Sequence, residues 1–484
     1  MPNPLTRKKS LASLLSQAGD SHHSLKRTLD AKHLVALGIG AIIGAGLFVR
    51  TAAASAEAAG PAVTLSFVVA AIGCLFAGLC YAEFAAMIPI AGSAYTYAYA
   101  TMGELVAWTI GWALVLEYAL GAATVSIAWS EYLNNLLDGA IPYQWCHSPL
   151  EVSAAGVHGL FNAPALLILF LLTALLIRGT QESATVNSII VFVKVSIVLV
   201  FIAIGWKFVS PANHTPYLIP DGIVGHEGIF RHGWGGVLGG AGIVFFAFIG
   251  FDAVSTAAQE AKNPERDMPV GILGSLAVCT VLYVLFAHVL TGVANWQEFA
   301  VAGKEASVAY AIQKYMVGYG WLATLVTIAI LAGFSSVILV MLLGQSRVFF
   351  SMAKDGLLPK IFADLHPRYH TPHKSNWLLL VFVGAFAAFI PGSMAGDLTS
   401  IGTLFAFVLV SGGIWVMRRS DPGAARPFRA PLVPLVPILG ILVCSGMIIA
   451  LDVVTQITAF GWMLIGFVVY FSYSRKHSKL QGVA

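Results

Sequence analysis

Long apolar runs, separated by short polar stretches, dominate this chain. Twelve of them are nearly free of charge and approach or exceed the roughly 20 residues that an α-helix needs to cross a bilayer. The predicted spans are 34–59, 62–88, 103–136, 163–178, 184–208, 235–259, 268–293, 319–352, 376–391, 398–417, 433–450 and 456–473. The pattern therefore predicts an all-α integral membrane protein with twelve transmembrane helices and no attached soluble domain.

The composition excludes other classes of protein. Of the 484 residues, 58% are hydrophobic and 10% are charged, against roughly 25% charged residues in a soluble domain. A net charge of +4 gives no argument for nucleic acid binding. The five cysteines, none in a CxxC pair, are Cys74, Cys80, Cys146, Cys279 and Cys444. We therefore expect no disulfide framework, no metal site and no cofactor.

Lys and Arg residues are distributed unevenly over the loops. If the N-terminus is cytoplasmic, 21 of the 27 lie on the cytoplasmic side, and Arg50 and Lys194 lie within spans. The four that fall outside are Lys207, Arg231, Lys304 and Lys314. Since positive charge is retained in the cytoplasm, both termini are expected there.

Residues 1–33 lack the apolar core of a signal peptide and are predicted to form a cytoplasmic tail. Within this tail, Leu11, Leu14 and Leu15 recur at helical spacing beside the basic residues 7–9. The segment is either a short helix on the membrane surface or a disordered tail.

Glycines interrupt the first and sixth predicted spans. The first contains Gly38, Gly40, Gly44 and Gly46, and the sixth contains Gly239, Gly240, Gly242 and Gly250. One such span would usually mark close helix packing. Two of them, each opening a group of five spans, are typical of inverted repeats with discontinuous helices. We therefore predict a five-plus-five inverted repeat with a substrate site at the level of the breaks.

Broken helices offer unpaired backbone groups to a small zwitterion. N–H groups that begin the second half of the first span could bind a carboxylate; they belong to Ala45, Gly46 and Leu47. Carbonyls freed by both breaks could accept hydrogen bonds from an ammonium group. They belong to Ile42, Ile43, Phe246, Ala247 and Ile249. Phe246 is either an ordinary core residue or an aromatic gate over the substrate.

Three ionisable side chains are predicted at membrane depth. Lys194 lies about 15 Å from either end of its span, too deep to reach water easily. It either forms an ion pair with Glu117 or Asp252 or exchanges a proton during function. Glu117 could attract a cationic substrate group, hold a proton or pair with Lys194. Asp252, after the break in the sixth span, is either a first-turn carboxylate favoured by the helix dipole or a ligand of the substrate.

A family resemblance rests on four segments. They read GIGAIIGAGLFV, YAEFAAMIPIAGSAYTYAYATMGE, FFAFIGFDAVSTAAQEAKNPERDMPVGI and GQSRVFFSMAKDGLLP. From about residue 25 to 475 the chain resembles the amino acid–polyamine–organocation transporters, and among them the cationic amino acid transporters with their bacterial proton-coupled members. The resemblance implies the five-plus-five fold, with a transporter core at 34–417, two outer spans at 418–474 and a cytoplasmic tail at 475–484.

The same resemblance assigns site residues. Substrate binding maps to Ile42, Ala45 and Gly46 in the first span and to Phe246, Ala247 and Ile249 in the sixth, and a third-span glutamate matches Glu117. Lys194 matches a fifth-span lysine that occupies the ion position of sodium-coupled relatives.

Eighth-span residues complete this assignment. Ser335 or Ser336 would be the neighbour of Lys194, unless these hydroxyls bond back to their own helix. The bulky Phe334 near the pocket would favour small substrates. Ala45 departs from relatives that often have Thr or Ser there, which removes a side-chain contact to the carboxylate.

The resulting hypothesis is a secondary active transporter of the bacterial cytoplasmic membrane. It would import L-amino acids, cationic or small neutral, together with protons by alternating access. Its expected partners are the substrate, protons and the lipid bilayer; a small membrane-protein partner is left open. The alternatives are an amino acid exchanger and a non-transporting sensor. An enzyme is not expected, because His147, His158 and His232 in the longest loops are isolated and lack metal-ligand spacing.

Overall fold

The computed structural model describes residues 7–9, 29–88, 93–153, 155–178, 184–300, 307–369 and 371–482. In this part of the chain, eight helices are long and apolar enough to cross a membrane, and four shorter apolar helices accompany them. Helices lie on all twelve predicted spans. The prediction of an all-α membrane protein is therefore confirmed. The tail helix considered around Leu11, Leu14 and Leu15 lies outside the described residues.

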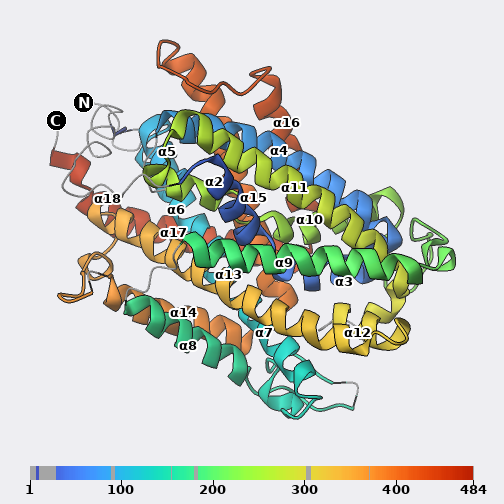
Figure 1. Ribbon diagram of the computed structural model, residues 1–484. Coiled ribbons are helices and arrows are strands. Elements are labelled where there is room, and N and C mark those ends of the chain that lie inside the picture. Colours follow the sequence, from blue (N-terminus) through green and yellow to red (C-terminus); the bar gives the residue numbers. More distant parts are fainter. Residues whose placement is uncertain are drawn as a thin grey trace.

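The helices follow one another along the chain, and the longest connections between them are residues 137–162 and 206–232 (Figure 1). The first half of the chain contains α2 (Ala31–Ile42), α3 (Thr51–Ala54), α4 (Val63–Met87), α5 (Ser93–Thr101), α6 (Glu104–Val115), α7 (Gly121–Leu136), α8 (Ala163–Ile177) and α9 (Ala184–Gly205). The second half contains α10 (Gly233–Val244), α11 (Pro264–Val293), α12 (Ser307–Tyr315), α13 (Gly320–Lys354), α14 (His373–Phe389), α15 (Gly392–Ser420), α16 (Leu435–Ala450), α17 (Val453–Val469) and α18 (Arg475–His477).

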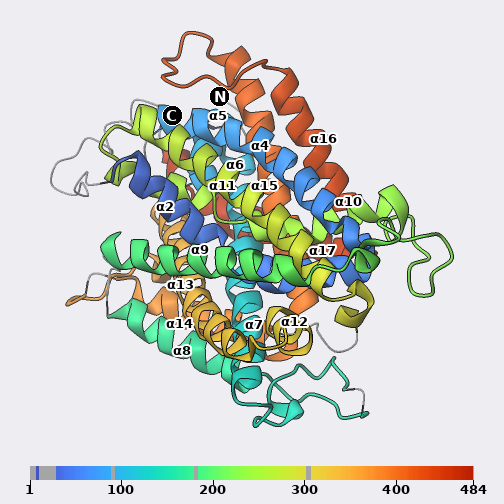
Figure 2. The same cartoon turned by 45° about the vertical axis from the view of Figure 1, so that its right-hand side comes forward.

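Small residues allow these helices to approach closely. The helices α4 and α11 run next to each other in both views (Figures 1 and 2), and α11 also packs along α2. A Cβ atom on Gly38 would lie 2.4 Å from Ser275 Oγ, and one on Gly271 would lie 2.7 Å from Leu34 Cβ. Since lipid tails are as apolar as the helices, such close packing is a main source of helix association in a membrane.

The first and sixth spans run antiparallel, with break beside break. α2 contacts the helical turns of residues 252–260, and residues 55–59 contact α10. Between these contacts, residues 46–50 lie against residues 245–248. Such pairing of opposite halves is the arrangement that an inverted repeat requires.

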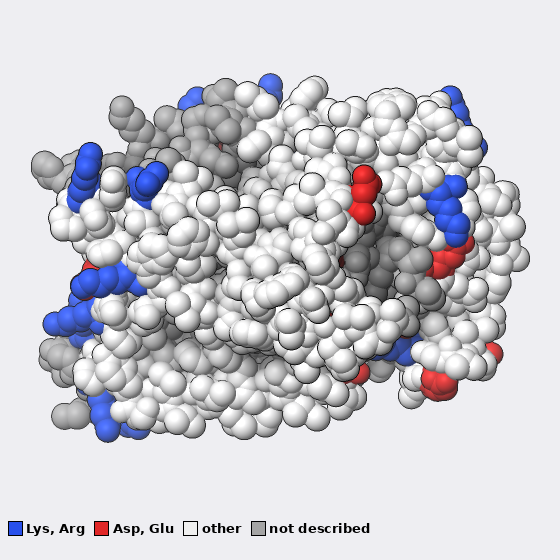
Figure 3. Space-filling model, turned by 90° about the horizontal axis from the view of Figure 1, so that it is seen from below, with Lys and Arg blue, Asp and Glu red and all other residues white. Residues whose placement is uncertain are grey.

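Two ends of the bundle can be distinguished. α5 and α18 lie at one end, the tail face, and the loop after α7 lies at the other, the loop face (Figure 1). On the side seen in Figure 3, Lys and Arg gather mainly at the tail face, whereas Asp and Glu lie towards the loop face.

The described part of the N-terminal tail is bound to the tail face. Lys9 Nζ forms an ion pair with Asp355 Oδ1 at 2.5 Å, and Tyr95 Oη donates to Asp355 Oδ2 at 2.7 Å. The Glu104 N–H donates to the Arg7 carbonyl at 3.0 Å. Arg7 Nη1 donates to the Leu480 carbonyl at 3.2 Å, so both tails cover this face together.

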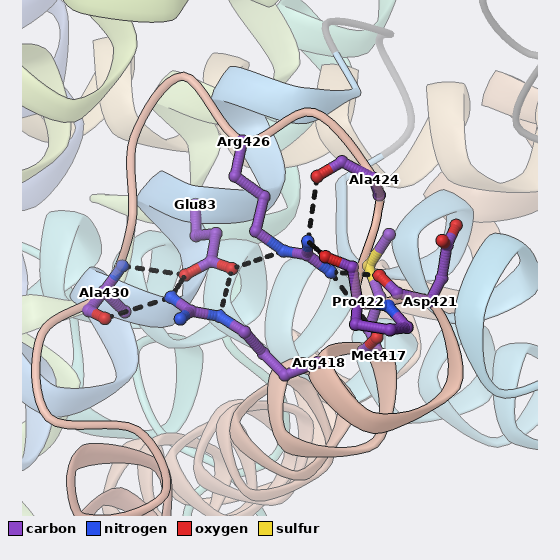
Figure 4. A network of polar contacts seen from close by, with 8 residues as sticks. All are labelled: Glu83, Met417, Arg418, Asp421, Pro422, Ala424, Arg426 and Ala430. Atoms are coloured by element: carbon purple, nitrogen blue, oxygen red, sulfur yellow. Dashed lines mark hydrogen bonds and ion pairs between the residues drawn. The ribbon is translucent and has the colours of Figure 1, made fainter.

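Glu83, near the end of α4, organises the connection between α15 and α16 (Figure 4). Its fully buried carboxylate accepts hydrogen bonds from Arg418 Nε at 2.9 Å and Nη2 at 2.6 Å. The Ala430 N–H adds a third bond at 2.7 Å, and Arg426 Nε lies 3.4 Å away. Because a buried carboxylate needs such compensation, the network fixes the connection against α4.

Candidate functional site

The first helix break lies at residues 43–44. α2 ends at Ile42, and Ile43 has an extended backbone with ψ of 104°. Beyond the break, the Leu47 N–H donates to the Gly44 carbonyl at 3.1 Å. The Leu47 N–H is therefore engaged in the local turn, unlike the free donor that the sequence suggested.

The second break lies at residues 249–250. Ile249 is extended, and Gly250 has φ of +114°, a conformation that favours glycine. The Ile249 N–H donates to the Phe246 carbonyl at 3.3 Å. The Phe246 side chain itself is buried.

The two breaks touch through their backbones. A Cβ atom on Gly46 would lie 2.2 Å from Ala247 Cα and 2.6 Å from Ala247 N. No side chain fits in this space without separating the spans. Gly46 therefore brings two of the predicted site segments into direct contact.

Tyr283 of α11, which the sequence analysis did not single out, links the two breaks. Its hydroxyl lies 3.0 Å from the Ile42 carbonyl and 3.0 Å from the Ala247 carbonyl. Both carbonyls are among those expected to face the substrate. A tyrosine hydroxyl at membrane depth needs a polar partner, and that requirement was the available sequence signal.

Lys194 reaches the first span from α9. Its Nζ donates to the Gly40 carbonyl at 2.9 Å, and the side chain is 3% exposed. The aliphatic part lies on α13, where a Cβ atom on Gly333 would be 2.8 Å from Lys194 Cε. Lys194 thus joins α9 to α2 and α13.

The neighbouring α13 residues have separate contacts. Ser335 Oγ donates to the Leu331 carbonyl of its own helix at 2.9 Å, and the Ser336 side chain is buried. Phe334 is fully buried and packs against Phe48 and Tyr132, with ring centroids 6.2 and 5.7 Å apart. Gly333, directly before these residues, is the α13 position at which the Lys194 side chain approaches the helix backbone most closely among the contacts given above.

Glu117 lies in a π-helical turn, Leu116–Leu120, between α6 and α7. Its carboxyl group lies near the Asp252 carboxyl, and neither of its oxygens has a hydrogen-bond partner among the described residues. Tyr118 Oη donates to Asp252 Oδ2 at 3.3 Å. All these groups are fully buried, so the two carboxyls form a polar pair inside the bundle. π-Helical turns are frequent at functional sites.

The loop histidines lie apart from these groups. His147 stacks on Tyr143, with ring centroids 3.7 Å apart. His232 contacts Asp221 at 3.2 Å, and His158 is exposed.

Paired helix breaks, a buried lysine and buried carboxyl groups at membrane depth are features that membrane transporters use. The amino acid permease family profile matches residues 29–473. The chain belongs to this family.

The relatives of this chain are named for several different substrates. A branched-chain amino acid permease of Bacillus subtilis is 44% identical over 485 residues, covering 99% of this chain and 100% of the relative. A methylthioribose transporter of the same organism is 41% identical, covering 98% and 99%. The human cationic amino acid transporter 4 is 34% identical, covering 85% of this chain and 68% of the relative.

Proposed function

We propose that this permease imports L-amino acids together with protons by alternating access, across the cytoplasmic membrane of a bacterium. Twelve spans would be arranged as a five-plus-five inverted repeat, with the tail face in the cytoplasm. Neutral aliphatic amino acids are the favoured substrates. The carboxylate would bind near Ala45 and Gly46, and the ammonium group near the Ile42 and Ala247 carbonyls.

The proposal of proton coupling rests on one observation: the buried Lys194 side chain donates a hydrogen bond from Nζ to the Gly40 carbonyl. An amine in this place ties α9 to the half-helix before the break. If the breaks rearrange as the site opens to either side, the proton affinity of the amine changes, and proton binding becomes linked to the conformational cycle.

The substrate preference rests on the groups near the breaks and on similarity. Phe334 and Phe246 offer apolar surface, and Glu117 faces Asp252 inside the bundle. The 44% identity with a relative named as a branched-chain permease agrees with this preference. Methylthioribose and a cationic amino acid such as arginine are the competing substrates to test, since other relatives are named as a methylthioribose transporter and as a cationic amino acid transporter.

The deciding experiment uses purified protein in lipid vesicles. We expect an inward proton gradient to stimulate uptake of L-leucine or L-alanine by the parent protein. Lys194→Met should abolish that stimulation, because it removes the amine. Lys207→Met, at the exposed end of the same span, is the matched control and should respond like the parent.

Other outcomes would change the proposal. If Lys194→Met is driven by the gradient as strongly as the parent, the proton is carried elsewhere, and the Glu117 and Asp252 pair becomes the next candidate. Uptake that occurs only when the vesicles contain amino acid would identify an exchanger. Binding without flux would identify a sensor.

A further inference from the structure

A cavity of about 290 Å³ opens on the loop-face side of the first break. One wall comes from the second half of the first span, where Ala45 and Val49 are spaced one helical turn apart. The other wall comes from α7, where Ile127 and Glu131 are likewise one turn apart. Its volume is close to the lower limit of about 300 Å³ for small-molecule pockets.

Arg50 is the one positively charged residue among the described residues that line this cavity. Its side chain is 3% exposed and forms an ion pair with Asp397 near the start of α15. Nη1 lies 3.5 Å from the Ser393 carbonyl, and Nε has no acceptor in the described structure. Since a guanidinium carries five N–H donors, Arg50 keeps capacity for a second carboxylate.

The remaining lining complements the other parts of an amino acid. Glu131 lies nearer the loop face than Ile127, because α7 runs towards that face, and its negative charge attracts an ammonium group. Val49 and Ile127 supply apolar surface for an aliphatic side chain. Charged groups of both signs therefore flank an apolar wall.

We propose that this cavity is an outer binding site for a zwitterionic L-amino acid, distinct from the site at the helix breaks. The substrate carboxylate engages Arg50, and the ammonium group faces Glu131. The incoming carboxylate uses the guanidinium donors that Asp397 and the Ser393 carbonyl leave free, so Arg50 holds the substrate next to its own tie to α15. This inference rests on the proposed amino acid transport.

Cysteine protection tests the outer site. Ala128→Cys places a thiol in the cavity wall, and the five native cysteines are all buried, so they should react slowly. We expect L-leucine to slow alkylation of this thiol about fourfold when three quarters of the sites are occupied. Leucinol, which lacks the carboxylate, should not protect. Ala140→Cys, exposed in the loop beyond α7, is the matched control and should react at the same rate with or without leucine.

Protection must also be measured in a variant in which the site at the helix breaks, here called the inner site, no longer binds substrate. Gly46→Ala serves this purpose, because its methyl group would collide with Ala247. Phe246→Ala is the second background if Gly46→Ala does not give a folded protein. Protection that persists in these backgrounds supports the outer site. Protection that requires an intact inner site overturns it, since the cavity would then be only the open path.

Two further results separate the inference from the proposed function. Equal protection by leucinol and leucine would overturn the role of Arg50. If the parent protein in vesicles transports no amino acid, the proposed function fails. If it transports leucine but shows no outer-site protection, only the present inference fails.

Discussion

One added methyl group at Gly46 should disrupt the site where the two broken helices meet. In Gly46→Ala, the new Cβ atom would lie 2.2 Å from Ala247 Cα. Carbon atoms in favourable contact are about 3.5 Å apart, so the two backbones would have to separate by about 1.3 Å. Both belong to the segments proposed to bind the substrate.

Overpacking of this kind usually costs about 1–3 kcal/mol. If that strain falls on the site, amino acid affinity decreases between about fivefold and about a hundredfold, since each 1.4 kcal/mol is a factor of ten. The Tyr283 hydroxyl would also lose its simultaneous proximity to the Ile42 and Ala247 carbonyls, which are now both 3.0 Å away.

Equilibrium binding of labelled L-leucine and L-alanine to purified protein measures this effect, with thermal unfolding recorded in parallel. Gly121→Ala is the control, because its Cβ atom would lie 3.5 Å from Thr399 Cγ2, an ordinary contact. We expect the control to bind and unfold like the parent. If Gly46→Ala also retains the parent's affinity and unfolding temperature, the close approach of the two breaks is wrong.

Three further changes test the surroundings of the site. Glu83→Gln should lower the free energy of unfolding by about 3–5 kcal/mol, because it leaves the buried Arg426 and the partly buried Arg418 without their counter-charge; an unfolding temperature equal to the parent's would contradict this. Lys9→Ala should increase amide hydrogen exchange at the tail-face end of α13, because it removes the ion pair with Asp355. Unchanged exchange would mean that this ion pair does not stabilise that end of α13. Burial, followed by the adjacent His288 ring, lowers the pKa of His214 from its ordinary 6.5. The unfolded state therefore binds the proton more tightly, and stability should decrease as the pH falls through and below about 6.5. His214→Gln should show a smaller decrease in unfolding temperature between pH 7 and 5, and an equal decrease would contradict the assignment.

The sequence by itself determined where the helices lie and where two of them break. Apolar runs long enough to cross a bilayer can be recognised from their length and composition alone. The glycine clusters at residues 38–46 and 239–250 predicted discontinuous spans, and the breaks occur at residues 43–44 and 249–250. The depth of Lys194 also followed directly, because the position of a residue within a span fixes its height in the membrane.

Only the tertiary structure decided which side chains meet. Most spans are apolar around their whole circumference, so their sequences do not identify the face that points inward. The Lys194 contact with Gly40 joins residues 154 apart, and the Arg50 ion pair with Asp397 joins residues 347 apart. The sequence left three roles open for Glu117. Its position near Asp252 depends on how the third span packs against the broken sixth span. Helix packing, which depends on small residues and close contacts between distant segments, settled these pairings.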